Sequence, residues 1–348
     1  MRRWVIVNIT LWTAIATLFS SCSVIDEDMS DCGEELKLYY DLHLVTNFSI
    51  ELQKELDRRT DATLVNALRD YLSPVFTDYA HDLDLSFYDH LGENVRLHRE
   101  QHIMDANELS CAINMPRRQY IHTAVANLEH NSVVTLEGSD FCHTAQFIQS
   151  LDNIVSPHNT GLFSARKEIN LEKGRNDTYE VHMYMANCSA ALVLDTSDAT
   201  LKDLKVVATG FASRFNIADS IYVFADTPSV VLADKIETGK DGLQCFCTVN
   251  FPSREEDVVK TRTVIETEEP FFSEDAQNSL WQFRVYATLP DGKVTESVLG
   301  VKKPLRAAQF KILHAHVYSN GGLEPDEPEV AVSITLDWKD AGNYVVPL

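Results

Sequence analysis

Alternating hydrophobic and polar residues predict a first β-strand over residues 36–44 (LKLYYDLHL). Successive side chains of a strand point to opposite faces, so its hydrophobic side chains should gather on one face. These side chains are Leu36, Leu38, Tyr40, Leu42 and Leu44. We therefore expect one side of this strand to lie in a core.

The period then changes from two to that of a helix. Leu52 and Leu56 lie one helical turn apart, as do Leu64 and Leu68, and Pro74 follows, so residues 50–72 are predicted to form a helix. Alternation returns at 83–88, and a turn at 92–94 leads into 95–98, which predicts a β-hairpin.

More strands are expected at 119–128, 132–136 and 161–165, and a long one at 178–195, bent near Asn187. Residues 140–151 are predicted to form a short helix, with Ser139 or Asp140 as its N-cap.

Polar residues become frequent over 196–203, where we place a domain boundary, giving domains 36–197 and 198–348. The second domain should be almost purely β, with strands at 204–209, 220–225, 243–250, 280–288, 310–318 and 330–338. Gly-containing turns such as Pro290-Asp291-Gly292 separate several of them. Many short strands and few helices predict a mainly β protein built from sandwiches or barrels.

The N-terminal residues have the pattern of an export signal. Arg2 and Arg3 precede an apolar run, and Ser20 and Ser21 stand directly before Cys22. This predicts a lipoprotein signal peptide over 1–21, with Cys22 becoming the lipidated N-terminus on a membrane. Phe19 departs mildly from the usual pattern. The alternative is an ordinary cleaved signal with a chance cysteine, but an A-x-A-like site is missing.

Residues 22–35 form an acidic tether with no Lys or Arg before Lys37. A solvated spacer explains this composition. The acidic residues also resemble the surface-export signal of Bacteroides-type lipoproteins, and the two explanations are compatible. Without a basic residue, the tether offers no site to an Arg-specific or trypsin-like protease.

Composition limits the possible partners. A formal net charge of -22 argues against nucleic acid and against a basic patch for anionic lipid. A hydrophobic content of 45% fits a folded chain with a core. Export would permit disulfides, but the sequence does not choose a pairing among the six other cysteines. They are Cys32, Cys111, Cys142, Cys188, Cys245 and Cys247.

Several segments only partly match known chemical motifs. His98-Arg99-Glu100-Gln101-His102 differs from H-E-x-x-H because its Glu is one place late. Cys245 with Cys247, and His314 with His316, each share a strand face; core packing or disulfides fit the thiols, and half-burial fits the imidazoles. The acidic segment 324–329 lacks the spacing of a calcium loop.

The sequence contains no G-x-S-x-G, P-loop or G-x-G-x-x-G motif. Paired carboxylates of a glycosidase would converge only in the fold, and nothing nominates such a pair. We therefore predict a protein that is not an enzyme and has no metal, cofactor or catalytic residue.

The chain resembles the FimB-type fimbrial anchor lipoproteins of Bacteroides-like bacteria, in the fimbrillin superfamily of donor-strand pili. The resemblance covers nearly the whole mature chain and rests on Cys22 with its acidic tether, LKLYYDLHL, PVFTDYAHDLDLSFYDHLGENV, RRQYIHTAVANL and YEVHMYMANCSAALVLD. LWQFRVYATLPDGKV and VAVSITLDW continue it in the second domain.

This resemblance implies two tandem transthyretin-like β-sandwiches, attached by lipid to the outer membrane and exposed at the surface. It further implies that the protein seats a fimbrium and limits its length, with a fimbrillin shaft subunit as partner through strand addition. An anchor must keep its lipidated N-terminus, which agrees with the tether. The segment after Trp338 leaves little for a long donor strand, although Tyr344-Val345-Val346 could form a short one.

The alternative is a glycan-binding or adhesin lipoprotein on the same scaffold, which would need exposed aromatic side chains. The sequence leaves open which fimbrial subunit would bind, and whether the role is that of anchor, accessory or tip subunit.

Overall fold

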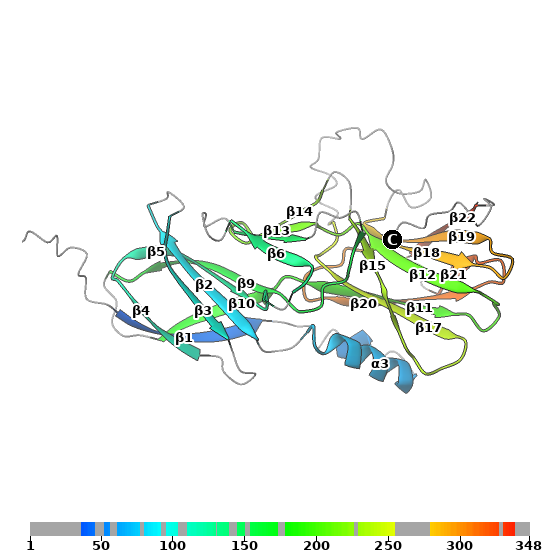
Figure 1. The fold of residues 1–348 in the computed structure, drawn as a ribbon, viewed down its shortest axis with the longest axis horizontal. Coiled ribbons are helices and arrows are strands. Elements are labelled where there is room, and N and C mark those ends of the chain that lie inside the picture. Colours follow the sequence, from blue (N-terminus) through cyan, green and yellow to red (C-terminus); the bar gives the residue numbers. More distant parts are fainter. Residues whose placement is uncertain are drawn as a thin grey trace, which may run out of the picture.

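The computed structural model describes residues 36–45, 52–55, 61–76, 80–91, 95–103, 110–129, 131–138, 145–149, 154–172, 178–225, 229–254, 279–326 and 330–337. Most of these residues lie in β-strands that form four sheets, and helical residues are few. The predicted fold class, mainly β with sandwich architecture and a few short helices, is confirmed. The molecule is elongated, with β1 at one end and β19 at the other (Figure 1).

The first sheet has seven strands in the order β3-β2-β5-β9-β10-β1-β4. Their bounds are β1 (Leu36–Val45), β2 (Asp82–Asp89), β3 (Arg96–Ile103), β4 (Ser110–Met115), β5 (Gln119–Ala126), β9 (Phe163–Asn170) and β10 (Thr178–Met185). The sheet curls over its own core and forms the first sandwich. The ring centroids of Tyr40 on β1 and Phe87 on β2 lie only 6.2 Å apart, although three strands separate β1 from β2. The predicted inward face of the first strand is confirmed: Leu36, Leu38, Tyr40 and Leu42 are buried.

A second sandwich pairs a five-stranded sheet with a six-stranded sheet. The five-stranded sheet is β16-β17-β11-β20-β21, formed by β11 (Cys188–Asp195), β16 (Asp234–Ile236), β17 (Leu243–Asn250), β20 (Phe310–Val317) and β21 (Leu323–Pro325). The other is β22-β19-β18-β12-β15-β8, formed by β8 (Ile154–Val155), β12 (Asp203–Thr209), β15 (Val230–Leu232), β18 (Trp281–Thr288), β19 (Val294–Val301) and β22 (Val330–Asp337). Leu192, Phe246 and Leu313 from the first meet Phe283, Val285 and Leu299 from the second in one core.

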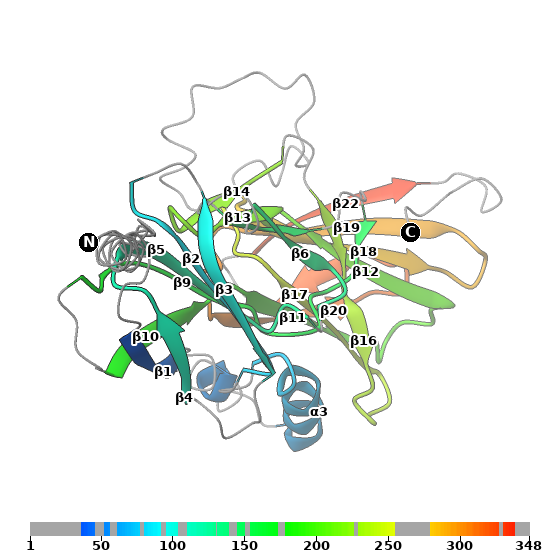
Figure 2. The same ribbon diagram turned by 60° about the vertical axis from the view of Figure 1, so that its left-hand side comes forward.

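A small third layer connects the two sandwiches. It contains β6 (Val134–Glu137), β7 (Gln146–Gln149), β13 (Arg214–Asn216) and β14 (Ile221–Val223), in the order β14-β13-β7-β6 (Figure 2). Phe147 and Phe215 stack in its core with their ring centroids 6.1 Å apart. The same core includes Val125 from β5 and Val231 from β15, so it contacts both large units.

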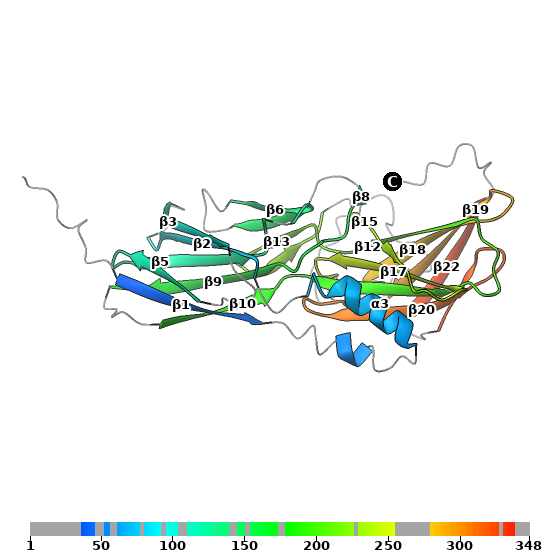
Figure 3. The ribbon, with the colours of Figure 1, turned by 60° about the horizontal axis from the view of Figure 1, so that its bottom comes forward.

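Helix α3 (Ala62–Leu72) precedes β2 in the chain but packs on the second sandwich (Figure 3). Its buried Leu64, Leu68 and Leu72 share a hydrophobic cluster with residues of β11 and β17, among them Val193 and Cys247. Asp61 caps the helix by accepting hydrogen bonds from the backbone N–H groups of Thr63 and Leu64, and it also pairs with Lys240 at 2.7 Å. The Tyr71 hydroxyl donates to Asp234 on β16 at 2.8 Å.

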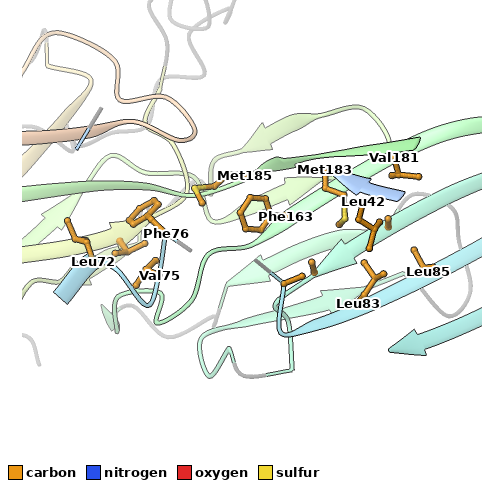
Figure 4. Packing of buried hydrophobic residues seen from close by; sticks show 14 of the residues in the cluster. Leu42, Leu72, Val75, Phe76, Leu83, Leu85, Phe163, Val181, Met183 and Met185 are labelled. Atoms are coloured by element: carbon orange, nitrogen blue, oxygen red, sulfur yellow. The ribbon is translucent and has the colours of Figure 1, made fainter. Parts of the chain in front are cut away.

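The hydrophobic cluster under α3 continues into the first sandwich. Phe76 and Val75 follow the helix and lie near Met185 and Phe163, which lead on to Leu42 and Leu83 (Figure 4). Gly161 is required for this approach, because a Cβ at this position would lie 2.1 Å from the Val75 carbonyl oxygen. One apolar cluster therefore joins the two sandwiches.

Several predicted elements agree with the structure, and two differ from it. The hairpin of β2 and β3 and the strands near 204–209, 243–250, 280–288, 310–318 and 330–338 are confirmed, and helical residues occur at 52–55 and 62–72. The helix predicted at 140–151 is wrong over the residues that the structure describes: residues 146–149 form β7, in which Phe147 and Gln149 alternate in burial with their neighbours, and β7 pairs with β6 and β13. Its proposed caps, Ser139 and Asp140, lie outside the described residues.

The long strand predicted over 178–195 is two strands in different sheets. β10 ends at Met185 and β11 begins at Cys188, so the expected bend near Asn187 is a passage from one sandwich to the other. Pairing therefore crosses the boundary predicted after residue 197: β11 joins β17 and β20, β8 joins β15, and β7 joins β13. The boundary stays a prediction that the stability of fragments can test.

Candidate functional site

The residue with predicted covalent chemistry, Cys22, lies outside the described residues, as do Cys32 and Cys142. The described chain begins where the predicted tether ends, at β1. β1 is an interior strand: it pairs in parallel with β10, from Tyr39↔Thr178 to Val45↔Tyr184, and antiparallel with β4, from Leu36↔Met115 to Asp41↔Ser110. Lipidation of Cys22 stays a prediction. If the tether is anchored there, β1 is the first described element that the anchor would hold.

Tyr40 of β1 contacts several aromatic rings in the core of the first sandwich. Its ring lies 5.5 Å from that of His122 on β5 and 5.6 Å from that of Tyr179 on β10, measured between centroids. His122 also stacks on Phe87 at 4.4 Å, and its Nδ1 lies 3.1 Å from the carbonyl oxygen of Ser86. Burial lowers the pKa of His122 to about 4 and raises that of Tyr179 to about 12. Both groups are therefore neutral at pH 7.

The outer face of β1 and β10 carries exposed rings. His43 and His182 are direct register partners and stack with their centroids 5.1 Å apart. Tyr39 is 45% exposed, with Lys37 Nζ 5.2 Å from its ring centroid, and Tyr184 is 60% exposed. Since these residues alternate with the buried ones, the face opposite the core displays aromatic side chains to solvent.

A buried polar network lies at the passage from β10 to β11. The Asn187 amide donates to Nδ1 of His158 at 2.8 Å, so the ring proton lies on Nε2 and donates to Gln149 Oε1 at 3.0 Å. Asn187 Oδ1 accepts from the backbone N–H of Leu162, and the Asn187 carbonyl accepts from that of Ala308. Burial lowers the pKa of His158 to about 3. This neutral network joins segments of both sandwiches.

The structure brings together part of the His98–His102 segment, but on a strand. His98, Glu100 and His102 alternate along β3, and His98 Nε2 lies 2.9 Å from Glu100 Oε1. The more distant His102 Nε2 lies 3.9 Å from Glu100 Oε2. In the part of the chain that the structure describes, no group of three or more His, Cys, Asp or Glu side chains is placed to hold a metal ion.

The other candidates lie in the second sandwich. Cys245 and Cys247 are buried free thiols in the cluster under α3, as core packing predicts, and Cys188 is a buried free thiol in the core between the two sheets. Burial raises the pKa of all three thiols. His314 and His316 are half-buried, as predicted, and His316 lies 3.6 Å from Asp198. Glu324, at the start of the predicted acidic loop, accepts a hydrogen bond from Tyr318, whereas 327–329 lie outside the described residues.

Sequence reasoning missed the roles of His122, His158 and Gln149. Each is a polar residue inside or beside an apolar run, a pattern that does not distinguish a buried network from a surface position. The one available signal was the predicted bend near Asn187.

Comparisons with known proteins give structural similarity only. No protein-family model and no curated protein matches the chain. A solved Bacteroides ovatus protein described as a candidate adhesin is 8% identical, with a TM-score of 0.49, over 85% of this chain and 95% of that one. The fimbrial anchor protein Mfa2 from Porphyromonas gingivalis is 10% identical, with a TM-score of 0.46, over 87% of this chain and 98% of that one. The tip fimbrial protein Mfa3 from the same organism is 12% identical, with a TM-score of 0.41, over 87% of this chain and 100% of that one.

Within the described residues, no helix is long and apolar enough to cross a membrane.

Proposed function

We propose that this protein is an outer-membrane lipoprotein, exposed at the cell surface, that anchors or nucleates a fimbrium and limits its length. It would do so by β-strand complementation with a fimbrillin shaft subunit, in a binding role without catalysis. The observation that carries the proposal is the N-terminal pattern: Arg2 and Arg3, an apolar run, Ser20-Ser21-Cys22, and an acidic tether that enters β1 directly. An interior β1 supports it, because an anchor has to retain the strand that links it to its lipid.

Strand complementation requires a sheet edge whose backbone groups can pair with an added strand. Among the described strands, the sheet edges of at least six residues are β3 and β4 of the seven-stranded sheet and β22 of the six-stranded sheet, and the other edges have two to four residues. β3 carries charged residues along RLHREQHI, and charged side chains oppose the addition of an apolar strand. We therefore place the preferred docking edge at β4 or β22.

Membrane attachment can be tested with two cysteine variants in the native host. Cys22→Ala should move the protein from the membrane fraction to the soluble fraction, because it removes the thiol that would be acylated. Cys32→Ala is the matched control: it removes a cysteine of the same tether and should leave the protein in the membrane fraction. Membrane retention of Cys22→Ala equal to that of the wild type would refute lipid anchoring at this residue.

The fimbrial role can be tested by deleting the gene and examining the cells by electron microscopy. Fimbriae should become longer or be shed into the medium, and the wild-type gene should restore them. Cys22→Ala should fail to restore them. Attached fimbriae of unchanged length in the deletion strain would refute the anchor role and leave the lipoprotein assignment intact.

The exposed rings of Tyr39 and Tyr184 favour a second candidate function, a surface-exposed glycan-binding or adhesin lipoprotein on the same scaffold. The two residues lie on one face, separated by roughly 20 Å at about 3.3 Å per residue. Exposed aromatic rings on one face of a sheet offer apolar surfaces on which sugar rings can stack. A titration with host or dietary glycans should then show binding that Tyr184→Ala weakens, and no binding to any glycan tested would oppose this role.

A further inference from the structure

We propose that β1 and β10 form a mechanical clamp that carries tension from the N-terminal tether into the second sandwich. The clamp is defined as the parallel pair β1 (Leu36–Val45) and β10 (Thr178–Met185), with β4 on the other side of β1. In the cell, the direction of tension rests on the proposed attachment at Cys22. The strength of the clamp depends only on the described fold.

The direction of the two strands decides how tension acts on them. They are parallel, and the C-terminal end of β10 points to the second sandwich, so the end of β1 at Leu36 points away from it (Figure 3). Pulling the tether against the second sandwich therefore slides β1 along β10. Hydrogen bonds between parallel strands are evenly spaced along their length, so this load is shared by the whole ladder and is not applied to one pair at a time.

Pairing on both sides of β1 adds to this resistance. β10 pairs with Tyr39 to Val45, and β4 pairs with Leu36 to Asp41, so every residue of β1 has a partner on at least one side. An edge strand could peel away from a single neighbour, whereas β1 has to leave two neighbours together.

Buried side chains oppose sliding as well. Leu36, Leu38, Tyr40 and Leu42 all point into the first core and are no more than 2% exposed. A shift by one residue would turn all four side chains to the solvent face. A shift by two would restore the faces but would have to draw the Tyr40 ring out of its contacts with Phe87, His122 and Tyr179.

The connection beyond β10 is also held in place. The backbone N–H of Ala186 donates to the Leu162 carbonyl at 2.8 Å, and Asn187 makes the buried hydrogen bonds to His158, Leu162 and Ala308. β11 then enters the five-stranded sheet between β17 and β20, with pairing along its whole length. Tension thus reaches the middle of the second sandwich and not an edge.

Single-molecule force spectroscopy of the purified full-length mature chain tests this proposal. In the first geometry, click-chemistry handles are placed at the N-terminus and at exposed Asp291, in the turn between β18 and β19, so that β1 is sheared. In the second geometry, the handles are at the N-terminus and at exposed Thr178, the first residue of β10, so that the strands are pulled apart from the same end. At equal loading rate, we expect a rupture force about twofold higher in the first geometry, because shear loads the whole β1–β10 ladder at once, whereas pulling from the same end loads one pair at a time.

The length released at the first rupture identifies the element that yields. If β1 leaves while α3 stays docked, segment 36–61 is freed, which is roughly 90 Å when extended at about 3.5 Å per residue. Equal forces in the two geometries, or a first rupture that frees the second sandwich while β1 stays in place, would overturn the clamp.

Two ring deletions provide a matched comparison. Tyr40→Ala should lower the first rupture force in the shear geometry, whereas Phe147→Ala removes an equally buried ring from β7, which pairs with neither β1 nor β10, and should leave this force unchanged. An equal decrease in both variants would overturn the assignment of the barrier to β1. If Tyr40→Ala does not fold, Tyr40→Leu takes its place, and the wild-type comparison of geometries needs no variant. These force measurements use soluble, unlipidated protein. A negative result would therefore refute the clamp without bearing on the fimbrial phenotype.

Discussion

A fragment that begins at the predicted boundary, residues 198–348, should not fold by itself. Two elements that precede residue 198 complete the second sandwich. β11 lies between β17 and β20 in the five-stranded sheet, and α3 covers the face of that sheet opposite the six-stranded sheet. Removing both elements takes away the central strand and one wall of the core.

The size of the loss follows from the side chains that leave. Leu192 and Leu194 of β11 lie in the core between the sheets, and Val193 lies in the cluster under α3. α3 adds Leu64, Leu68 and Leu72, each no more than 2% exposed. Six such side chains contribute about 1.5–3 kcal/mol each, or about 9–18 kcal/mol together. This is comparable with the whole free energy of unfolding of an ordinary domain, about 5–15 kcal/mol.

Thermal unfolding followed by circular dichroism, together with the dispersion of amide proton signals, provides the assay. The full mature chain should unfold cooperatively, and fragment 198–348 should not. Fragment 188–348 restores β11 but leaves the α3 face uncovered, so it should bind a dye that recognises exposed apolar surface. A cooperative transition with dispersed amide signals in fragment 198–348 would refute this reasoning and would support the boundary after residue 197.

Three further predictions follow from buried groups. Gly161→Ala should lower the free energy of unfolding by about 1–3 kcal/mol in urea titrations, because its Cβ would overlap the Val75 carbonyl, and an unchanged midpoint would contradict this close approach. Stability should fall as the pH drops from about 6.5 to about 4, because the unfolded chain protonates His122 and His158 there while the native rings, with pKa values of about 4 and about 3, stay neutral. His122→Phe should reduce this acid-induced loss by about 3 kcal/mol, and an equal pH dependence in the variant would oppose the assignment. Alkylation followed by mass spectrometry should leave the buried thiols unmodified in the native protein and modify them after unfolding. These thiols are Cys188, Cys245 and Cys247.

The local patterns that proved reliable are those in which a strand has one or both faces in a core. β17, predicted over 243–250, occupies those residues, because its β-branched and apolar side chains suit a strand in any sheet. The error at 146–149 arose because short apolar segments carry too few residues to distinguish period two from a helical period. β19 was also missed: its sequence, VTESVLGV, mixes polar and apolar residues without a clear alternation, and it is held by its neighbours β18 and β22.

The candidate site also contains features that the sequence indicated and contacts that it could not indicate. The sequence indicated Cys22, the tether and the inward face of β1, because each depends on neighbouring residues alone. It could not indicate that Tyr40 would meet Phe87 and His122, or that Asn187 would meet His158, because each of these contacts joins segments far apart in the chain.

The sequence by itself determined that the chain is mainly β, which face of the first strand is buried and where the chain changes direction near Asn187, since the alternation of side chains is a local property. Only the tertiary structure decided which sheet each strand joins. β10 and β11 are consecutive but belong to different sandwiches, and α3 packs on strands more than a hundred residues further along the chain. The physical reason is that an apolar face specifies that it must be covered but not by which partner, and the partner is selected by the packing of the whole chain.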